Sequence, residues 1–391
     1  MRARPVVVVG PARSGTTLVA RMLDAHPRVT VACDPLLPLL RAVRDAAVAD
    51  AAPGALGPDA PFQDCYFQPG PHAALVALLA ARPGVRAPRE RRGALSSTMA
   101  ARARHEEPAL AVPLSRLEGD TCGELVRAAF GVIAAGAPRA EVAGTKEVWA
   151  IDAVPFLARC LPGLRAVVVR RDPRAIVVSN LGMGATDPGQ VGHPFSVARH
   201  WRKQEALLAE LGHRGLAPED VHVVRDEDVV ADSEGASRAL TAFLEIDHVG
   251  DLAHPERLRD GAGRPWRANS SFGRPGAGAR PELAEGWRGR IDAADLAAVE
   301  LIAGPEMRAA GYAPDLDDER AMGPESLAAL TAAHAGEWSW RSDLGRPERE
   351  HRLETRRRSV LDDDEPAPDA VRDHFLFESA RAAVRAAVVP S

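Results

Sequence analysis

The stretch that most constrains the fold lies near the N-terminus and reads VVVVGPARSGTTLVARMLDAHP, residues 6–27. Its four consecutive valines are typical of a strand that is buried on both faces of a parallel sheet. Gly10 ends this run, and from Thr16 to Asp24 the apolar residues recur at helical spacing before Pro27 stops the helix. A buried strand, a glycine-rich turn and a helix in this order predict an α/β fold.

The turn between strand and helix resembles a phosphate-binding loop without its lysine. Loops that bind a nucleoside triphosphate read G-x-x-x-x-G-K-[ST], with the lysine on the phosphates and the hydroxyl on magnesium. Here Gly10 and Gly15 have the right spacing, but Thr16 occupies the lysine position. Because a glycine turn at a helix N-terminus aims backbone N–H groups and the helix dipole at an anion, we expect phosphate binding here. The expected binding residues are Arg13, Ser14, Gly15, Thr16 and Thr17.

Strand and helix patterns alternate again in the second part of the chain. Asp172 before Pro173 is typical of a helix N-cap followed by proline at the first helical position. Alternation of this kind predicts a parallel sheet covered by helices on both faces. We expect one strand that ends near Thr145 and two further strands over 165–169 and 221–225. The expected helices span 151–160, 195–212 and 234–245, and another begins at Pro173.

Two regions depart from this alternation. Residues 46–130 are rich in Ala, Pro, Gly and Arg with weak periodicity, and we interpret them as a variable, mostly helical insertion that covers a substrate pocket. Within it, residues 82–95 (RPGVRAPRERRGAL) are predicted to be an exposed loop. We expect the main domain to span 1–315 and a C-terminal extension, with an amphipathic helix near 368–388, to span 316–391.

Composition narrows the functional classes. The chain of 391 residues carries a formal net charge of -5, which gives no general reason to expect nucleic-acid binding. No stretch has the length of a membrane span. The four scattered cysteines (Cys33, Cys65, Cys122 and Cys160) form no metal or disulfide pattern, so we expect a cytoplasmic protein.

Two motifs together resemble a known family. VGPARSGTTLVARMLDAHP is similar to the 5′-phosphosulfate loop of sulfotransferases that use 3′-phosphoadenosine-5′-phosphosulfate (PAPS). It is closer to tyrosylprotein sulfotransferases and related bacterial enzymes than to cytosolic arylsulfotransferases, which carry a lysine in this loop. VVVRRDPRAIVVSN then gives Arg171 and Ser179, a pair that holds the 3′-phosphate in the family. The resemblance covers residues 5–45 and 140–312 and implies a P-loop-type parallel sheet, PAPS as donor and no metal.

The resemblance also implies catalytic residues, namely Asp34, Lys146 and Arg13. Lys146 matches a lysine near the leaving-group oxygen, and Asp34 lies where tyrosylprotein-type enzymes have a glutamate base. An alternative for Asp34 is that it caps a helix beginning at Pro35. Other candidate bases are His72, His105 and His193, whereas His26 is expected to be structural. The later loop 265–291 is similar to the segment that closes over the 3′-phosphate and adenine, with candidates Asn269, Ser270, Ser271 and Arg280.

The resemblance implies transfer of a sulfuryl group from PAPS to a hydroxyl, and the expected cytoplasmic location favours a small-molecule acceptor, such as a sugar, lipid or secondary metabolite. One alternative is a P-loop kinase for nucleotides or small molecules, which would need a lysine on the phosphates and a magnesium site. Another is a non-catalytic relative that keeps the nucleotide-binding loops and lacks a base. The acidic pair in VVRDEDVV, residues 223–230, is interpreted as scaffold.

Overall fold

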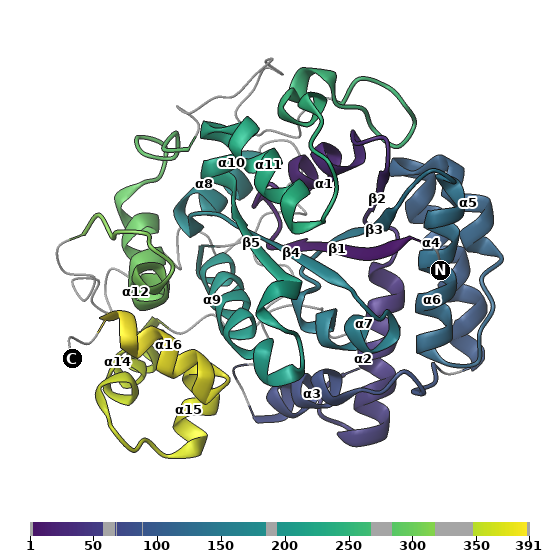
Figure 1. Ribbon diagram of the computed structural model, residues 1–391. Helices are drawn as coiled ribbons and strands as arrows, with labels where there is room; N and C mark the ends of the chain where they lie inside the picture. The colour runs from purple at the N-terminus through teal and green to yellow at the C-terminus, as the bar shows by residue number, and fades with distance from the viewer. Residues whose placement is uncertain are drawn as a thin grey trace.

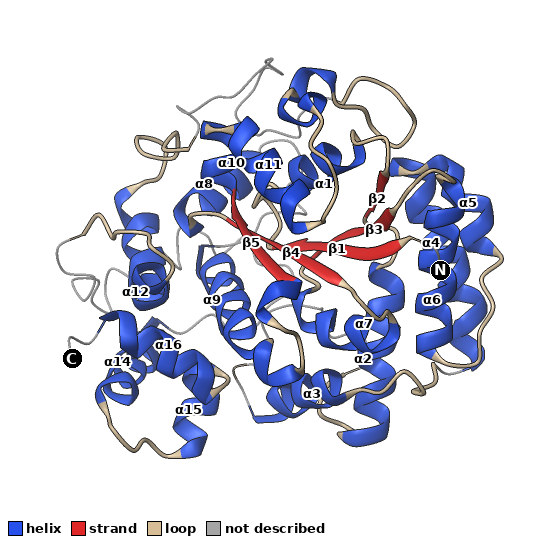
Figure 2. Cartoon of the chain, viewed as in Figure 1, coloured by secondary structure: helices blue, strands red, loops and turns tan. Residues whose placement is uncertain are grey.

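A computed structural model describes residues 3–57, 67, 69–87, 89–184, 194–266, 284–316 and 347–388. Its centre is a parallel sheet of five strands in the order β2-β3-β1-β4-β5, with helices on both faces (Figure 2). This confirms the predicted α/β class. The strands are β1 (Arg4–Gly10), β2 (Val29–Cys33), β3 (Val142–Val148), β4 (Arg165–Arg170) and β5 (Val221–Arg225).

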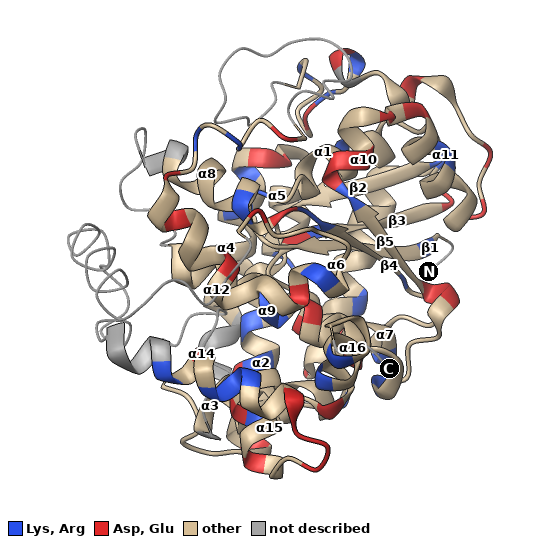
Figure 3. Ribbon diagram, turned by 90° about the vertical axis from the view of Figure 1, so that its left-hand side faces the viewer, with Lys and Arg blue, Asp and Glu red and all other residues tan. Residues whose placement is uncertain are grey.

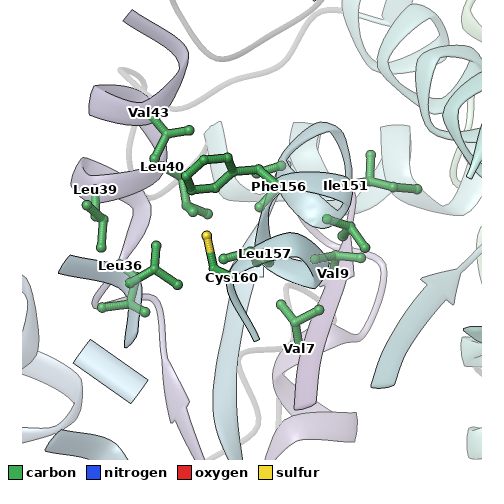
Figure 4. Close-up of a cluster of buried hydrophobic side chains, with 14 of the residues drawn as sticks. Val7, Val9, Leu36, Leu39, Leu40, Val43, Ile151, Phe156, Leu157 and Cys160 are labelled. Carbon is green, nitrogen blue, oxygen red and sulfur yellow. The ribbon is translucent and has the colours of Figure 1, made fainter. Parts of the chain in front are cut away.

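The valines of β1 are buried on both faces of the sheet, as their sequence pattern predicts. Val6 and Val8 pack with one hydrophobic cluster, whereas Val7 and Val9 belong to another, shown in Figure 4. All four side chains are 0% exposed. Burying one valine side chain stabilises a fold by about 1.5–3 kcal/mol, so this strand anchors the loop that follows it.

The helices of the first half are α1 (Thr16–Asp24), α2 (Leu37–Ala51), α3 (Pro69–Ala80), α4 (Arg89–Glu106), α5 (Pro108–Ser115) and α6 (Cys122–Gly136). The insertion is therefore mostly helical, as predicted. The loop expected over residues 82–95 is wrong in its second half, because α4 begins at Arg89. Arginine and glutamate are good helix formers, and a proline directly before them favours a helix start over a long loop.

The helices of the second half are α7 (Val154–Cys160), α8 (Pro173–Gly184), α9 (Pro194–Glu210), α10 (Asp226–Ala231), α11 (Ser233–Phe243) and α12 (Ala293–Ala309). They lie close to the predicted positions. Asp172 accepts a hydrogen bond from the backbone N–H of Arg174 at 2.8 Å, which confirms its expected role at the start of α8. Strand β3 continues to Val148, beyond its expected end near Thr145, because the polar residues at its end are buried against partners.

The C-terminal extension contains α14 (Pro347–Asp362), α15 (Pro368–Phe375) and α16 (Glu378–Val388). These helices, yellow in Figure 1, pack on one another, and α16 lies against α9 and α12. The single amphipathic helix expected over 368–388 is wrong. Leu376 adopts a left-handed conformation with φ 68° and separates α15 from α16, and its carbonyl accepts a hydrogen bond from His72.

A buried charge network joins this extension to the rest of the chain. Arg357 of α14 donates to Glu306 of α12 at 2.7 Å and to Glu354 at 2.7 Å. Arg202 of α9 donates to Glu354 at 2.9 Å and to the carbonyl of His374 at 2.8 Å. Because these side chains are nearly inaccessible, each charge depends on its partners for compensation.

Charged residues of both signs are interspersed along the ribbon in Figure 3. Throughout the described ranges, helices long and apolar enough to cross a membrane are absent.

Candidate active site

The five parallel strands end at one edge of the sheet, and residues predicted from the sequence to bind or react follow these ends. The glycine-rich loop follows β1, Asp34 follows β2, and Arg171 follows β4. Lys146 lies within β3, directly before its last two residues. The order of the strands reverses around β1, and open α/β sheets bind ligands at such a point.

The glycine-rich loop is shaped by close backbone approaches. Gly15 has φ 89°, and a Cβ there would lie 2.0 Å from Oδ1 of Asp226, so only glycine fits. The Ser14 hydroxyl turns back into the loop and donates to the carbonyl of Pro11 at 2.8 Å. Thr16 is buried and Thr17 half-buried in the first turn of α1. Within the described part of the chain no side chain caps this helix, which leaves its first N–H groups for an anion.

Two arginines from different loops meet at this point. Arg13 Nε donates to Ser179 Oγ at 2.9 Å, and Arg171 donates to the carbonyl oxygen of Arg13 at 2.9 Å. Burial lowers the pKa of Arg13, and the neighbouring charge of Arg171 lowers it further. Holding two guanidinium groups together is unfavourable unless negative charge lies between or beside them. The arrangement therefore favours binding of an anion.

Asp226, at the end of β5, partly neutralises these arginines. Its Oδ2 lies 3.1 Å from Arg171 Nε, and burial raises its pKa while Arg171 and Arg13 oppose the rise. The neighbouring Glu227 accepts hydrogen bonds from the Asp172 amide at 2.8 Å and the Tyr312 hydroxyl at 3.0 Å. This agrees with the scaffold interpretation of the acidic pair. Sequence reasoning missed the direct contact between Asp226 and Arg171, although both residues follow strand ends.

Asp34 and Lys146 form an ion pair on neighbouring strands. The Asp34 carboxylate also accepts from the Val148 amide at 3.3 Å, and the Asp34 carbonyl accepts from Arg102 Nε at 2.8 Å. The backbone of Asp34 is left-handed, with φ 55°. Burial opposes the charged form of Lys146, but the attractions of Asp34, Cys33 and Glu147 together outweigh burial and raise the pKa of the lysine.

The alternative role of Asp34 as a helix cap is wrong. Helix α2 begins at Leu37, Leu36 is its N-cap residue, and no side chain caps it. The carboxylate of Asp34 is directed instead to Lys146 and to the β3 backbone. Asp34 is therefore free of a capping role and lies at the carboxyl edge of the sheet.

Glu147 is a buried carboxyl that sequence reasoning missed. Its Oε1 accepts from the Leu36 amide at 2.6 Å and from the Thr145 hydroxyl at 2.9 Å, and its Oε2 has no hydrogen-bond partner among the residues that the structure describes. Burial, and then the charge of Asp34, raises the pKa of Glu147 to about 8. The side chain is consequently neutral below that pH and fixes the turn directly after Asp34. In the sequence, this role of Glu147 is indicated only by the position of a charged residue inside a strand pattern.

The histidines considered as bases lie elsewhere. His72 contacts the C-terminal extension through the Leu376 carbonyl at 2.9 Å, and the His105 side chain is 88% exposed beside Glu106. His26 bridges the Arg28 amide and the Asp247 carbonyl, in agreement with a structural role. The remaining candidates lie outside the described residues: His193, Asn269, Ser270, Ser271 and Arg280.

Helix α9 supports the end of β4 from behind. Trp201 Nε1 donates to the carbonyl of Arg171 at 2.8 Å, and Gln204 donates to the carbonyl of Val169 at 3.3 Å. Glu205 binds Arg170 through two hydrogen bonds of 2.5 and 3.1 Å. These contacts fix the backbone that presents Arg171. In the part of the chain with described coordinates, groups of three or more potential metal ligands do not occur.

Comparison with known protein families gives one match. The model of the sulfotransferase family matches residues 5–250. The structure is similar to the sulfotransferase domain of the Synechococcus PCC 7002 olefin synthase, at 16% identity and a TM-score of 0.43, covering 77% of this chain and 95% of that one. It is also similar to the sulfotransferase domain from the curacin biosynthetic pathway, at 15% identity and a TM-score of 0.43, covering 74% and 92%.

A third similar structure is sulfotransferase STF9 from Mycobacterium avium, at 15% identity and a TM-score of 0.33, covering 64% of this chain and 66% of that one. No curated protein sequence matches the chain. The family model covers well over half of the 391 residues. The chain therefore belongs to the sulfotransferase family.

Proposed function

We propose that the protein transfers a sulfuryl group from PAPS to a hydroxyl of a small-molecule acceptor. The observation that carries this proposal is the meeting of Arg13, Arg171 and Ser179 beside the uncapped start of α1. Arginines in this arrangement suit a ligand that carries phosphate groups. Binding of triphosphate with magnesium is disfavoured, because Thr16 replaces the lysine of such loops.

The residues present fit this donor. Arg171 and Ser179 would hold its 3′-phosphate, and the loop residues Arg13, Thr16 and Thr17, with the N–H groups of α1, would hold the 5′-phosphate. Ser14 and Gly15 shape the loop, since one hydrogen-bonds within it and the other accommodates Asp226. Within 265–291, Asn269, Ser270 and Arg280 are proposed to complete the nucleotide site. The donor supplies the sulfuryl group, and the protein supplies binding and positive charge.

Asp34 and Lys146 have different roles in the proposed reaction. Asp34 would accept the proton of the attacking hydroxyl, and Lys146 and Arg13 would stabilise negative charge on the departing phosphate oxygen. The Asp34 side chain is 24% exposed, whereas that of Lys146 is 3% exposed. An incoming acceptor therefore reaches the carboxylate before the ammonium group. The sulfur–oxygen bond to the phosphate breaks as the bond to the acceptor oxygen forms.

The domain organisation is also a proposal. Residues 1–315 would form the transferase domain, in which α2 and α4 flank Asp34 on the acceptor side. Residues 316–391 would support it from outside, since α16 packs on α9, the helix that holds the end of β4. The extension would then act on the site through α9 and not through direct contact with the nucleotide.

The proposal is tested by calorimetry and by transfer of labelled sulfate from PAPS. Asp34→Asn should lower turnover at least about a hundredfold while 3′,5′-adenosine bisphosphate binds with unchanged affinity. A fully active Asp34→Asn variant would remove Asp34 as the base. A wild-type protein that binds the bisphosphate but transfers sulfate to no hydroxyl compound would support the non-catalytic alternative.

A further inference from the structure

Arg102 lies against Asp34, and Arg41 and Arg44 lie near Arg102; the proposed nucleotide site uses none of the three. Arg41 and Arg44 belong to α2, which begins just after Asp34, and Arg102 belongs to α4. Arg102 Nε donates to the carbonyl oxygen of Asp34 at 2.8 Å, so its guanidinium group lies against the proposed base. Helices α2 and α4 pack together, and the charges of Arg44 and Arg102 both act on Arg41, so the three guanidinium groups lie near one another.

The charge in this cluster is only partly compensated. Arg44 is 1% exposed and binds Asp45 at 2.9 Å. Arg41 is exposed and makes no hydrogen bond or ion pair with any residue in the described ranges. Burial, and then the charges of Arg44 and Arg102, lower the pKa of Arg41, while Asp45 opposes this effect. Such mutual repulsion is relieved by a bound anion.

The nearby carboxylates do not provide that anion. Asp34 is already paired with Lys146, and Asp45 with Arg44. The adjoining Glu147 has a pKa raised to about 8 by burial, so it contributes no full negative charge at neutral pH. Positive charge from Arg41 and Arg102 therefore remains on the acceptor side of Asp34.

We propose that the acceptor carries an anionic group in addition to its hydroxyl, and that Arg41 and Arg102 bind that group. This inference rests on the proposed function, because it takes Asp34 as the base that the hydroxyl approaches. A carboxylate, phosphate or sulfate is the chemical class that a pair of guanidinium groups recognises. Since Arg102 contacts the backbone of Asp34 itself, the anionic group would lie a few atoms from the reacting hydroxyl. A neutral acceptor would leave both arginines without a ligand.

The test uses inorganic phosphate as the probe. The full-length protein is saturated with 3′,5′-adenosine bisphosphate, and phosphate is then titrated at constant ionic strength by calorimetry. We expect a saturable site that weakens at least about tenfold in the double variant Arg41→Gln/Arg102→Gln, as expected for lost charge-assisted hydrogen bonds. Arg104→Gln, on the exposed face of the same helix α4, is the matched control and should not change binding.

Absence of a saturable phosphate site, or binding that is unchanged in the double variant, overturns the inference. Failure of the bisphosphate itself to bind would instead contradict the proposed nucleotide site, so the two failures are distinguishable. A second readout is the KM for sulfate transfer to acceptors of a metabolite extract, separated by anion exchange. Products should form from the retained fraction, with KM raised in the double variant, and products confined to the neutral fraction would also overturn the inference.

Discussion

Replacement of Gly15 by alanine tests the geometry of the proposed site most sharply within the loop. Gly15 has φ 89°, where an L-residue costs about 1–2 kcal/mol. The new Cβ would also lie 2.0 Å from Oδ1 of Asp226, far inside van der Waals contact. Asp226 must therefore move, and its 3.1 Å contact with Arg171 must change with it. We expect a loss of stability of about 1–3 kcal/mol and bisphosphate binding weakened at least tenfold.

Gly215 offers a matched control on the surface. It has φ 91°, and a Cβ there would meet nothing within 4 Å. Gly215→Ala should therefore cost about 1–2 kcal/mol from backbone strain alone and leave nucleotide binding unchanged. Urea denaturation gives the stabilities and calorimetry gives the affinities. Equal bisphosphate affinity in the two variants would refute the role assigned to the contact between the loop and Asp226.

Further predictions concern stability. Glu147→Gln should stabilise the protein increasingly as pH rises from about 4.5 to about 8, because over this range the wild-type carboxyl ionises in the unfolded chain but stays protonated in the fold. The gain in the free energy of unfolding should be a few kcal/mol at about pH 8.5 and should vanish near about pH 4. Equal effects at both pH values in urea denaturation would contradict this. Arg357→Met should lower the free energy of unfolding by about 3–5 kcal/mol, because Glu306 and Glu354 would lose this buried positive partner. Arg238→Met, which breaks the exposed ion pair with Glu234, should lower the free energy of unfolding by at most about 1 kcal/mol. Similar losses for both variants would argue against a stabilising role of the buried charge network.

Local patterns predicted the elements that local interactions determine. The valine run, the glycine spacing and the helical period from Thr16 to Asp24 predicted β1, the loop and α1 with the observed helix bounds. Asp172 and Pro173 likewise predicted the start of α8. These signals lie within one turn of the element they define, so tertiary packing had little opportunity to override them.

Contacts between distant segments could not be predicted in the same way. Arg13 and Ser179 are 166 positions apart, and only the family resemblance suggested that both bind the nucleotide. The contacts of Asp226, Glu147 and Arg102 could not be predicted, since each acts through a partner brought near by sheet pairing or helix packing. The break at Leu376 is similar, because the helical period continues through it. Propensity alone does not report such tertiary constraints.

Binding of 3′,5′-adenosine bisphosphate, compared with ATP in the presence and absence of magnesium, tests the central claim most directly. If Arg13, Arg171 and Ser179 form a nucleotide site for PAPS, calorimetry should show metal-independent binding of the bisphosphate that Arg171→Ala weakens at least tenfold. Binding of ATP alone, and only with magnesium, would contradict the sulfotransferase site and favour a kinase.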